Sequence, residues 1–500
     1  MLGGVTLHVG QLLHQWALRA PERVALVEGD ARWTYGDLDA AAQRAAGALA
    51  EAGVEPGDRV LLCAANSGRF VATWFGALYA GAAVVPVPIL SAPPEIAFRA
   101  EHAGAEVAVA DGERRGVCAR AGLTALAVEE LEGPALDLRD EPAGLAMMLY
   151  TSGTTGKPKG AAIGHESLFA HTAALVQHTL RFGADEVVLG ALPFTHSFGI
   201  RMAVLAPFFA GGRVVLPPPG RFDADASLAL AAREAVTWLP GVPTMFDAWA
   251  RTEGAPLRAL RWGLSAGAPL ADDVRRRAEA RLGAEVRQGY GLTEATFTSI
   301  DAPPGEPTPG SVGAPVWGIE VRVRDEAGAE LPPGEVGEIC VRGQNVMRGY
   351  LDDPEATAAV MGDGWLRTGD LGRLDARGRL FVVDRLKDLI LRGGHNVYPS
   401  EVEDAIADHP DVAAVAVVGR DDAHYGEEVV AVLVLEEGAG FDAAAFDAFC
   451  RERLSKVKVP REVVRVDALP LGPSRKVLRR TLRDWIAGGR LTPTRLSAAG

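Results

Sequence analysis

Cysteine is scarce in this sequence, and its distribution excludes two classes of structure. The four cysteines, Cys63, Cys118, Cys340 and Cys450, lie far apart in 500 residues, and none belongs to a CxxC pair. Such spacing cannot build a disulfide framework and does not match a zinc site. We therefore expect free, buried thiols and a cytoplasmic location, where the environment is reducing.

Basic residues are also in short supply. The chain has 51 Lys and Arg against 65 Asp and Glu, which gives a formal net charge of −14 at pH 7. This surplus argues against a general nucleic-acid or anionic-membrane binder, although a local basic patch could still hold an anion. The N-terminus lacks a basic segment that leads into an apolar run, so we predict no signal peptide.

One stretch without charged residues is long enough to span a bilayer. It covers residues 70–94, but two glycines and four prolines interrupt it. Elements of a parallel sheet that are buried on both faces are also continuously apolar. The sequence therefore favours a buried helix followed by a buried strand, and we predict no membrane span.

The length and the element pattern predict more than one domain, because 500 residues exceed what one hydrophobic core usually supports. Short apolar runs alternate with helix-length segments in the first half, which indicates repeated β/α units. The chain becomes β-rich from Gly310 and α+β from near Asp384, where Ser400 and Glu403 have the spacing of a helix capping box. The predicted fold class is α/β, with a large multi-sheet N-terminal domain that includes a β-rich subdomain (residues 1–386) and a small α+β C-terminal domain (residues 387–500).

A loop rich in glycine, hydroxyl groups and lysine follows an expected strand at residues 145–149. Such a loop can turn backbone N–H groups and hydroxyls toward a phosphate chain, with lysine as the counter-charge. It is not a Walker A loop, because Gly153 and Gly156 are too close and Pro158 follows Lys157. A flexible surface linker is the alternative. The candidate phosphate-binding residues are Thr151, Ser152, Gly153, Thr154, Thr155 and Lys157.

The segment GYGLTE, residues 289–294, has the composition of a nucleotide and metal site. Its glycines, Gly289 and Gly291, would let the backbone approach a ligand, and Tyr290 offers a flat face for adenine. Glu294 supplies the hard oxygen that magnesium prefers. The GxG pattern alone is weak, since Glu294 stands where the dinucleotide fingerprint has its third glycine.

Seven segments in order resemble the motifs of the acyl-adenylate-forming superfamily, which includes acyl-CoA ligases, firefly-type luciferases and adenylation domains of peptide synthetases. Order and spacing match over roughly residues 10–485. The C-terminal half, in GQNVMRGYLDDPEATA, most resembles fatty acid CoA ligases. The seven segments are TSGTTGKPKG (151–160), PFTHSFG (193–199), GYGLTE (289–294), TGD (368–370), DRLKDLI (384–390), RGGHNVYPSE (392–401) and PSRKVLR (473–479).

The resemblance implies an ATP- and magnesium-dependent acid–thiol ligase, which forms an acyl-AMP, releases pyrophosphate and passes the acyl group to CoA. Two anions must then be brought together, so the site needs positive charge near the α-phosphate. By resemblance, Lys476 supplies it from a mobile C-terminal domain, whereas by sequence alone it could equally be a surface lysine. Arg475 departs from the glycine usual in the family.

The resemblance assigns further roles around the nucleotide and the thiol. Thr293 and Glu294 belong to the catalytic segment, and Thr154 joins Glu294 in holding magnesium. The remaining assignments are Gly267 and Ala268 beside adenine, Asp370 and Arg385 on the ribose, Lys387 as the hinge between domains, and Gly393, Gly394 and His395 along the pantetheine channel, where His395 replaces the usual tyrosine or phenylalanine.

The expected acid-binding pocket is mostly apolar, which suits a fatty, cyclic or aryl acid. Its residues are His196, Phe198, Arg201, Met202, Gly241, Ser265, Gly267 and Phe297. His196, also in a catalytic motif, is expected to form a wall or gate rather than act as a base, because a carboxylic acid is already ionised at pH 7. If Arg201 points inward it could pair with a second carboxylate, but the sequence favours a solvent-facing position.

The acceptor and the oligomeric state have alternatives that the sequence leaves open. Between Gly343 and Thr368 there is no insertion of the type that fatty acyl-AMP ligases carry, which favours CoA over a carrier protein. A rival interpretation is an acyl-AMP ligase that loads an acyl carrier protein in specialised-metabolite biosynthesis. Another, prompted by Arg475, is a non-catalytic adenylate-binding module. We expect a monomer or a homodimer.

Overall fold

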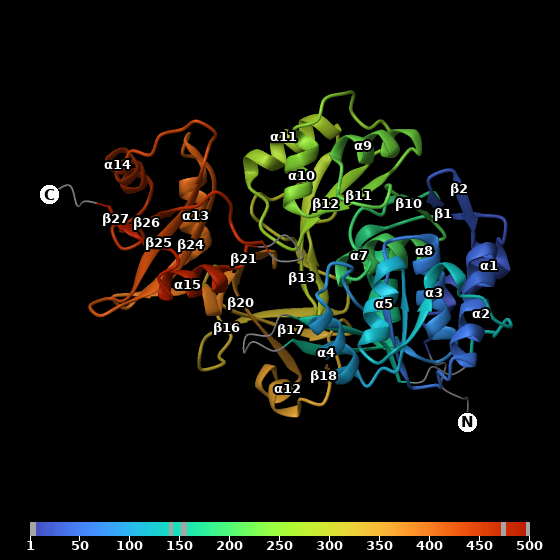
Figure 1. The fold of residues 1–500 in the computed structure, drawn as a ribbon. Helices are drawn as coiled ribbons and strands as arrows, with labels where there is room; N and C mark the ends of the chain where they lie inside the picture. Colours follow the sequence, from blue (N-terminus) through green and yellow to red (C-terminus); the bar gives the residue numbers. More distant parts are fainter. Residues whose placement is uncertain (1–6, 140–143, 152–157, 472–476, 497–500) are drawn as a thin grey trace. The chain divides into compact units, whose positions relative to one another are not determined.

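The computed structural model describes residues 7–139, 144–151, 158–471 and 477–496 (Figure 1). The chain forms two compact units, and it passes between them several times, whereas the sequence predicts a single boundary at residue 387. That boundary and its hinge stay predictions. The first unit comprises Met1–Val321, Cys340–Arg367 and Gly378–Leu380, and the second comprises Arg322–Ile339, Thr368–Arg377 and Phe381–Gly500.

A seven-stranded sheet of the first unit carries the start of the predicted phosphate loop. Its strand order is β18 (Gly349–Tyr350), β8 (Lys159–Gly164), β7 (Leu145–Thr151), β4 (Ala83–Pro86), β3 (Arg59–Cys63), β5 (Val107–Ala110) and β6 (Thr124–Ala127). The helices before and between these strands are α1 (Gln11–Arg19), α2 (Tyr35–Glu51), α3 (Gly68–Tyr79), α4 (Pro93–Ala103), α5 (Gly112–Arg120) and the short η1 (Val128–Glu130). Thr34 caps α2, since its side chain accepts from the Asp37 N–H.

The uncharged stretch at residues 70–94 forms a buried helix and a buried strand, as predicted. Most of it lies in α3, which Ser67 caps through a hydrogen bond from the Phe70 N–H, and in β4, whose four residues are all buried. No helix in the described ranges is both long and apolar enough to cross a membrane. The four cysteines are buried, as expected.

A nine-stranded sheet forms the other main layer of the first unit. Its order is β15 (Ala314–Pro315), β14 (Thr296–Ile300), β13 (Glu285–Leu292), β12 (Trp262–Ala266), β11 (Trp238–Gly241), β9 (Val187–Leu189), β10 (Arg213–Leu216), β1 (Val24–Glu28) and β2 (Ala31–Thr34). Helices α9 (Ala224–Arg233), α10 (Pro243–Ala250) and α11 (Asp272–Leu282) lie together beside β11 and β12 (Figure 1). Leu228, Trp249 and Leu282 from these helices share a core with Leu239 and Val286 of the sheet.

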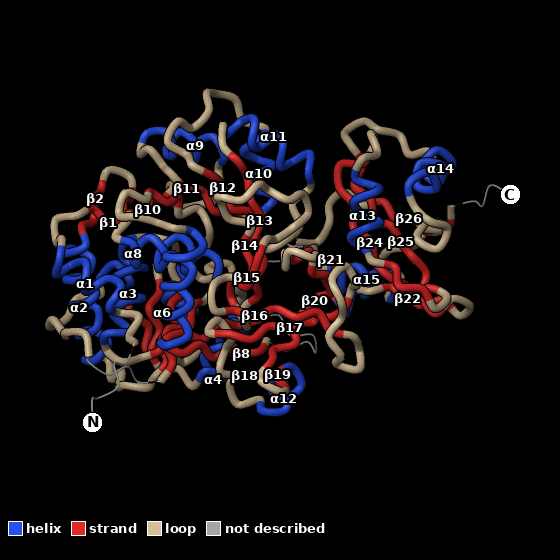
Figure 2. The backbone as a smooth tube through the Cα atoms, turned by 180° about the vertical axis from the view of Figure 1, so that it is seen from behind, coloured by secondary structure: helices blue, strands red, loops and turns tan. Residues whose placement is uncertain are grey.

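Two helical segments of the first unit continue from α-helix into π-helix. Helix α6 (His165–Ala174), which contacts β7 and β8 (Figure 2), runs into η2 (Leu175–Leu180). Helix α7 (Ser197–Ile200) runs into η3 (Arg201–Leu205) and then α8 (Ala206–Ala210). The π-helix is rare and is frequently found at functional sites, so both segments are of interest for the site.

A five-stranded sheet and the C-terminal α+β fold complete the chain and confirm the predicted fold class. The five-stranded sheet has the order β16 (Ile319–Arg324), β17 (Gly337–Gly343), β20 (Trp365–Leu374) and β19 (Met361–Gly362), with β21 (Leu380–Arg385) beside β20; α12 (Pro354–Val360) precedes β19. The C-terminal sheet has the order β23 (His395–Val397), β22 (Ile390–Arg392), β25 (Gly426–Leu435), β26 (Glu462–Arg465) and β27 (Thr494–Arg495), with β24 (Val412–Asp422) beside β25. Its helices are η4 (Leu386–Asp388), α13 (Pro399–Ala407), α14 (Ala443–Arg453) and α15 (Arg479–Ala487).

The predicted capping box at Ser400 is wrong. Helix α13 begins at Pro399, with Tyr398 as its N-cap. The Ser400 hydroxyl instead donates to the Val383 carbonyl at 2.6 Å, and Glu403 pairs with Arg479 at 2.6 Å. Long-range partners therefore take both side chains away from the local role that their spacing indicated.

Candidate active site

The carboxyl ends of three parallel strands bring several predicted residues to one edge of the nine-stranded sheet. Gly241 at the end of β11 is paired with Ser265 of β12, and Ala266 is paired with Gly289 of β13. Ser265 is buried, and its Oγ has no hydrogen-bond partner among the residues described. Gly267 follows with φ +91° and is exposed, as is Ala268. In open α/β sheets, ligands bind at this edge.

The GYGLTE segment forms the end of β13 and the turn of a β-hairpin. Its glycines therefore allow β14 to pack closely against β13, in addition to any approach of a ligand. A Cβ on Gly291 would lie 2.1 Å from the carbonyl oxygen of Thr296, and a Cβ on Gly289 would lie 3.1 Å from the Phe297 ring. Thr296 is buried with φ +40°, a region that a β-branched residue rarely adopts. Thr293 and Glu294 lie in the turn between these strands, and both are half-buried.

Tyr350 contacts Glu294 and thereby connects it to the strand that follows the phosphate loop. The Tyr350 hydroxyl donates to Glu294 Oε1 at 2.9 Å, while its backbone is paired with Ala161 of β8. Lys159 Nζ lies 5.0 Å from the centroid of the same ring. Burial and the Glu294 carboxylate raise the pKa of Tyr350, so its hydroxyl keeps the proton that it donates.

The predicted phosphate loop is described only at its two ends. Thr151 is the last residue of β7 and is paired with Lys159 of β8. Ser152, Gly153, Thr154, Thr155 and Lys157 lie outside the described residues, as do Arg475 and Lys476. Their assigned roles therefore stay predictions.

The predicted acid pocket gathers aromatic side chains from α7 and β14. His196 is the N-cap residue of α7 and is half-buried. The Phe198 and Phe297 rings meet edge to face, with centroids 5.1 Å apart. Met202, in η3, is fully buried. Phe198 and Phe297 thus form an apolar contact beside the GYGLTE turn.

The expectation that Arg201 faces solvent is wrong. Arg201 is the first residue of η3 and is only 1% exposed. Its Nη1 donates to Nδ1 of His171 on α6 at 2.7 Å. A position on a helix that points to solvent would leave Arg201 exposed, whereas all five residues of η3 are buried.

His171, which the sequence analysis missed, fixes this arginine. His171 is fully buried, and its Nε2–H donates to the Phe297 carbonyl at 2.8 Å, which leaves Nδ1 to accept from Arg201. Burial and the neighbouring arginine hold the pKa of His171 well below its usual value, so the ring is neutral. No local motif surrounds His171, because its partners come from distant elements.

In the second unit, the structure brings the two predicted ribose-binding residues together. Arg385 Nε lies 3.2 Å from Asp370 Oδ1, and Asp370 is buried while Arg385 is largely exposed. The Thr368 hydroxyl accepts from the Asp370 N–H and donates to the Ile339 carbonyl, which orients the TGD turn. Lys387 is exposed in η4, where partial burial and Arg385 lower its pKa.

The predicted pantetheine residues form the tip of a β-hairpin. Gly393 and Gly394 join β22 to β23 with φ +57° and +79°, the conformation that two-residue hairpin turns require. Both glycines and His395 are exposed. A bare backbone at an exposed turn can approach a ligand closely.

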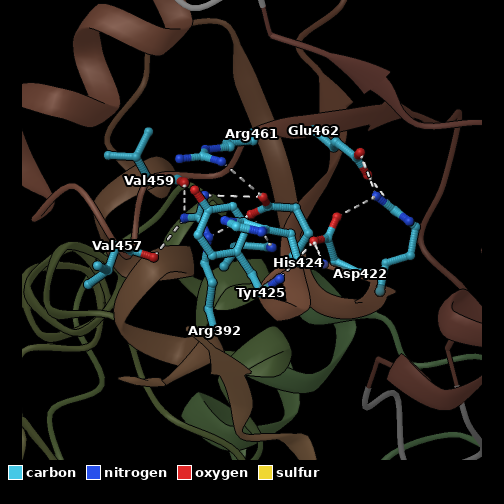
Figure 3. Close-up of polar contacts among 11 residues, drawn as sticks. Arg392, Asp422, His424, Tyr425, Val457, Val459, Arg461 and Glu462 are labelled. Atoms are coloured by element: carbon cyan, nitrogen blue, oxygen red, sulfur yellow. Dashed lines mark hydrogen bonds and ion pairs between the residues drawn. The ribbon is translucent and has the colours of Figure 1, made fainter. Parts of the chain in front are cut away.

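A buried ion pair between Arg392, the last residue of β22, and Glu428 lies next to this hairpin turn, and Figure 3 shows the polar contacts of Arg392. Arg392 is 3% exposed; its Nε lies 2.8 Å from Glu428 Oε1, and its Nη1 donates to the carbonyls of Val457 and Val459. The Gly393 N–H donates to the Tyr425 carbonyl at 2.7 Å. A cavity of about 380 Å³ adjoins this cluster, lined by Arg420, Asp422, His424, Tyr425, Glu428, Arg461, Glu462 and Arg495.

The residues present fit a magnesium ion that is held with the nucleotide rather than in a protein cage. Within the described parts of the chain, no three His, Cys, Asp or Glu residues gather as a metal site. Magnesium is usually bound by one or two carboxylates together with substrate phosphates. Glu294, half-buried and oriented by Tyr350, suits that role.

Comparisons with known proteins identify the family to which the chain is similar. Residues 13–351 match the AMP-binding enzyme family, and residues 401–476 match the AMP-binding enzyme C-terminal domain. Feruloyl-CoA synthase from Amycolatopsis is 37% identical over 95% of this chain and 99% of its own. Sulfoacetate–CoA ligase from Cupriavidus necator is 35% identical over 93% and 94%. The structure of o-succinylbenzoate coenzyme A synthetase from Bacillus subtilis with ATP and magnesium has a TM-score of 0.86 at 32% identity, covering 95% and 99%.

The chain belongs to the AMP-binding enzyme family, since the family match covers well over half of it. Within that family it is an AMP-forming acyl-CoA ligase. Its substrates are a small-molecule acid, ATP with magnesium, and CoA.

The neutral state of His171 predicts a loss of stability on acidification. Its pKa is far below 6.5 in the folded state. Below pH 6.5 the unfolded chain therefore takes up a proton at this residue that the folded chain does not. The free energy of unfolding consequently decreases as the pH is lowered. His171→Gln should reduce the slope of unfolding free energy against pH between about 6 and 4 by up to about 1.4 kcal/mol per unit. Urea unfolding over this range measures it.

The remaining slope should come from other buried histidines, because burial also lowers the pKa of His8 to about 4 and that of His165 to about 3. A wild-type slope in His171→Gln would show that His171 is charged in the folded protein.

Proposed function

We propose that this enzyme forms the acyl-adenylate at the carboxyl edge of β11–β13 and forms the thioester at the 393–395 hairpin. The observation that carries the proposal is the convergence of Gly241, Ser265 and Gly289 at one sheet edge, next to the Glu294 turn. The buried Ser265 hydroxyl, which has no hydrogen-bond partner in the described part of the chain, supports it, because such a group costs stability unless a ligand pairs with it.

The first half-reaction joins a carboxylate to the α-phosphate of ATP. A carboxylate oxygen attacks the α-phosphorus, pyrophosphate leaves, and a mixed anhydride with AMP forms. Both reactants are anions, so positive charge at the reacting phosphorus lowers the barrier. Lys476 is proposed to supply that charge, with Thr154 and Glu294 holding magnesium, which neutralises phosphate charge. No general base is needed, so His196 serves as a pocket wall.

The second half-reaction moves the acyl group to the thiol of CoA. The sulfur attacks the acyl carbon and AMP leaves with the bond electrons. The exposed glycine turn at 393–394 supports a role as the wall of a narrow thiol channel, and the Asp370–Arg385 pair supports a role on the ribose hydroxyls. A rotation at Lys387 is proposed to exchange the groups that serve the two half-reactions.

The identity of the acid and of the acyl acceptor defines the specificity of the enzyme. The acids in the relatives' names, among them ferulate and sulfoacetate, are chemically unlike one another, so the names do not select one. The pocket's aromatic pair, Phe198 and Phe297, accommodates an apolar segment of the acid. We propose that a carrier protein does not replace CoA as the acceptor, and that the enzyme acts as a monomer or homodimer in the cytoplasm.

The reaction is tested with a panel of acids and both acceptors. Acid-dependent exchange of labelled pyrophosphate into ATP should identify the substrate, and CoA should then yield AMP and acyl-CoA in equal amounts. A phosphopantetheinylated carrier protein in place of CoA should yield little thioester. Thioester formation only with the carrier would refute the proposed acceptor, and ATP binding without exchange for every acid would indicate a non-catalytic module.

Lys476→Ala should separate the two half-reactions. Loss of the charge at the α-phosphate should slow adenylation by about 10²–10³-fold, whereas thioester formation from supplied acyl-AMP should be nearly intact. Lys387→Pro should show the reverse, because proline fixes φ and would prevent rotation at the hinge. Equal losses in both half-reactions would contradict either role. Single-turnover assays of each half-reaction make the measurement.

Tyr350→Phe should weaken the function of Glu294 without removing its carboxylate. The variant loses a hydrogen bond to a charged group, so kcat/KM for pyrophosphate exchange should fall about 10-fold and half-saturation should need more magnesium. Tyr35→Phe is the matched control, since it loses a buried hydrogen bond to the Gly212 carbonyl instead. Equal magnesium dependence in Tyr350→Phe and the wild type would exclude this role for Tyr350.

A further inference from the structure

Arg201 is a buried cation whose hydrogen-bonding capacity is only partly used. Its guanidinium donates from Nη1 to His171, but Nε and Nη2 have no hydrogen-bond partner among the residues described. The side chain is 1% exposed, so bulk water does not replace the missing partners. Buried polar groups are nearly always paired, and an unpaired charged group is especially costly.

No carboxylate in the described parts of the chain forms an ion pair with Arg201. Its side-chain partner among the described residues, His171, is neutral and offers no compensating charge. Burial alone lowers the pKa of Arg201 to about 9, which still leaves it charged at pH 7. Arg287 provides the contrast within the same unit: it is 3% exposed, but it pairs with Glu285 at 2.5 Å and lies 3.6 Å from Asp301.

The position of Arg201 relates this unpaired cation to the acid pocket. It lies three residues after Phe198, whose ring contacts Phe297, and the Phe297 carbonyl accepts from His171. His171 therefore holds the guanidinium and the pocket wall together. The same hairpin places Glu294 only two residues before Thr296, whose hydroxyl lies 3.3 Å from His171 Nδ1.

We propose that Arg201 binds a second anionic group of the acid substrate, so that the enzyme acts on acids with two negative charges. Arg201 then receives oxygen acceptors for Nε and Nη2, the edge of the guanidinium that suits a carboxylate or sulfonate. A neutral acceptor would satisfy the hydrogen bonds but would not offset the charge. His171 acts as a positioning residue. The inference rests on the proposed function and names its substrate class.

The test compares pairs of acids that differ in the second anionic group. Succinate is paired with butyrate, malonate with propionate and phthalate with benzoate, and each is assayed by acid-dependent pyrophosphate exchange. In the wild type, kcat/KM for the best dianion should exceed that of its partner by about 10–100-fold, the range for hydrogen bonds to charged groups. Arg201→Gln should reduce this ratio to about 1, mainly by lowering kcat/KM for the dianion. Arg201→Lys should retain part of the preference for the dianion.

Arg287→Gln is the matched control, since it also removes a buried arginine but should leave the ratio unchanged. A wild-type preference for the monoanion in every active pair would overturn the inference while leaving the proposed function intact, and so would an unchanged ratio in Arg201→Gln. Absence of exchange with every acid would count against the proposed function as well. If Arg201→Gln does not fold, the wild-type ratios decide the question.

Discussion

The close passage of the Thr296 carbonyl over Gly291 is the constraint on which the candidate site depends. Only a residue without a Cβ allows this approach, and the approach folds β13 back onto β14 directly after the GYGLTE segment. The turn then presents Glu294, while Phe297 packs against Gly289. One steric requirement thus sets the position of both a charged group for the nucleotide and an apolar group for the acid.

Two polar contacts extend from this hairpin in different directions. Through Glu294 it meets Tyr350, and so the strand that follows the phosphate loop. Through the Phe297 carbonyl it meets His171, and so Arg201. The first contact pairs a carboxylate with a neutral donor, whereas the second holds a cation that has no counter-charge among the residues the structure describes. The predicted acid pocket therefore has a positive charge next to it, that of Arg201, which no described residue compensates.

In the second unit, the buried arginine next to the glycine hairpin has a carboxylate partner. Arg392 is also buried, but Glu428 pairs with it and two carbonyls accept from it. A fully hydrogen-bonded network of this kind makes its surroundings rigid, and it lies next to the Gly393–Gly394 turn, which has no side chains to pack. Buried arginine therefore serves two purposes in this protein, and the presence or absence of a carboxylate partner distinguishes them.

The sequence by itself determined the α/β class, because alternating apolar runs and helix-length segments follow from local pattern and composition, and its ordered motifs carried the family resemblance that assigned residues at the ends of β11, β12 and β13. It did not determine which distant groups meet. Ser400 and Glu403 had the spacing of a cap but bind Val383 and Arg479 instead. His171 and Tyr350 carry no local signal, and Arg201 was expected in solvent. Only the tertiary structure decided their roles, because burial and pairing depend on elements far apart in the chain.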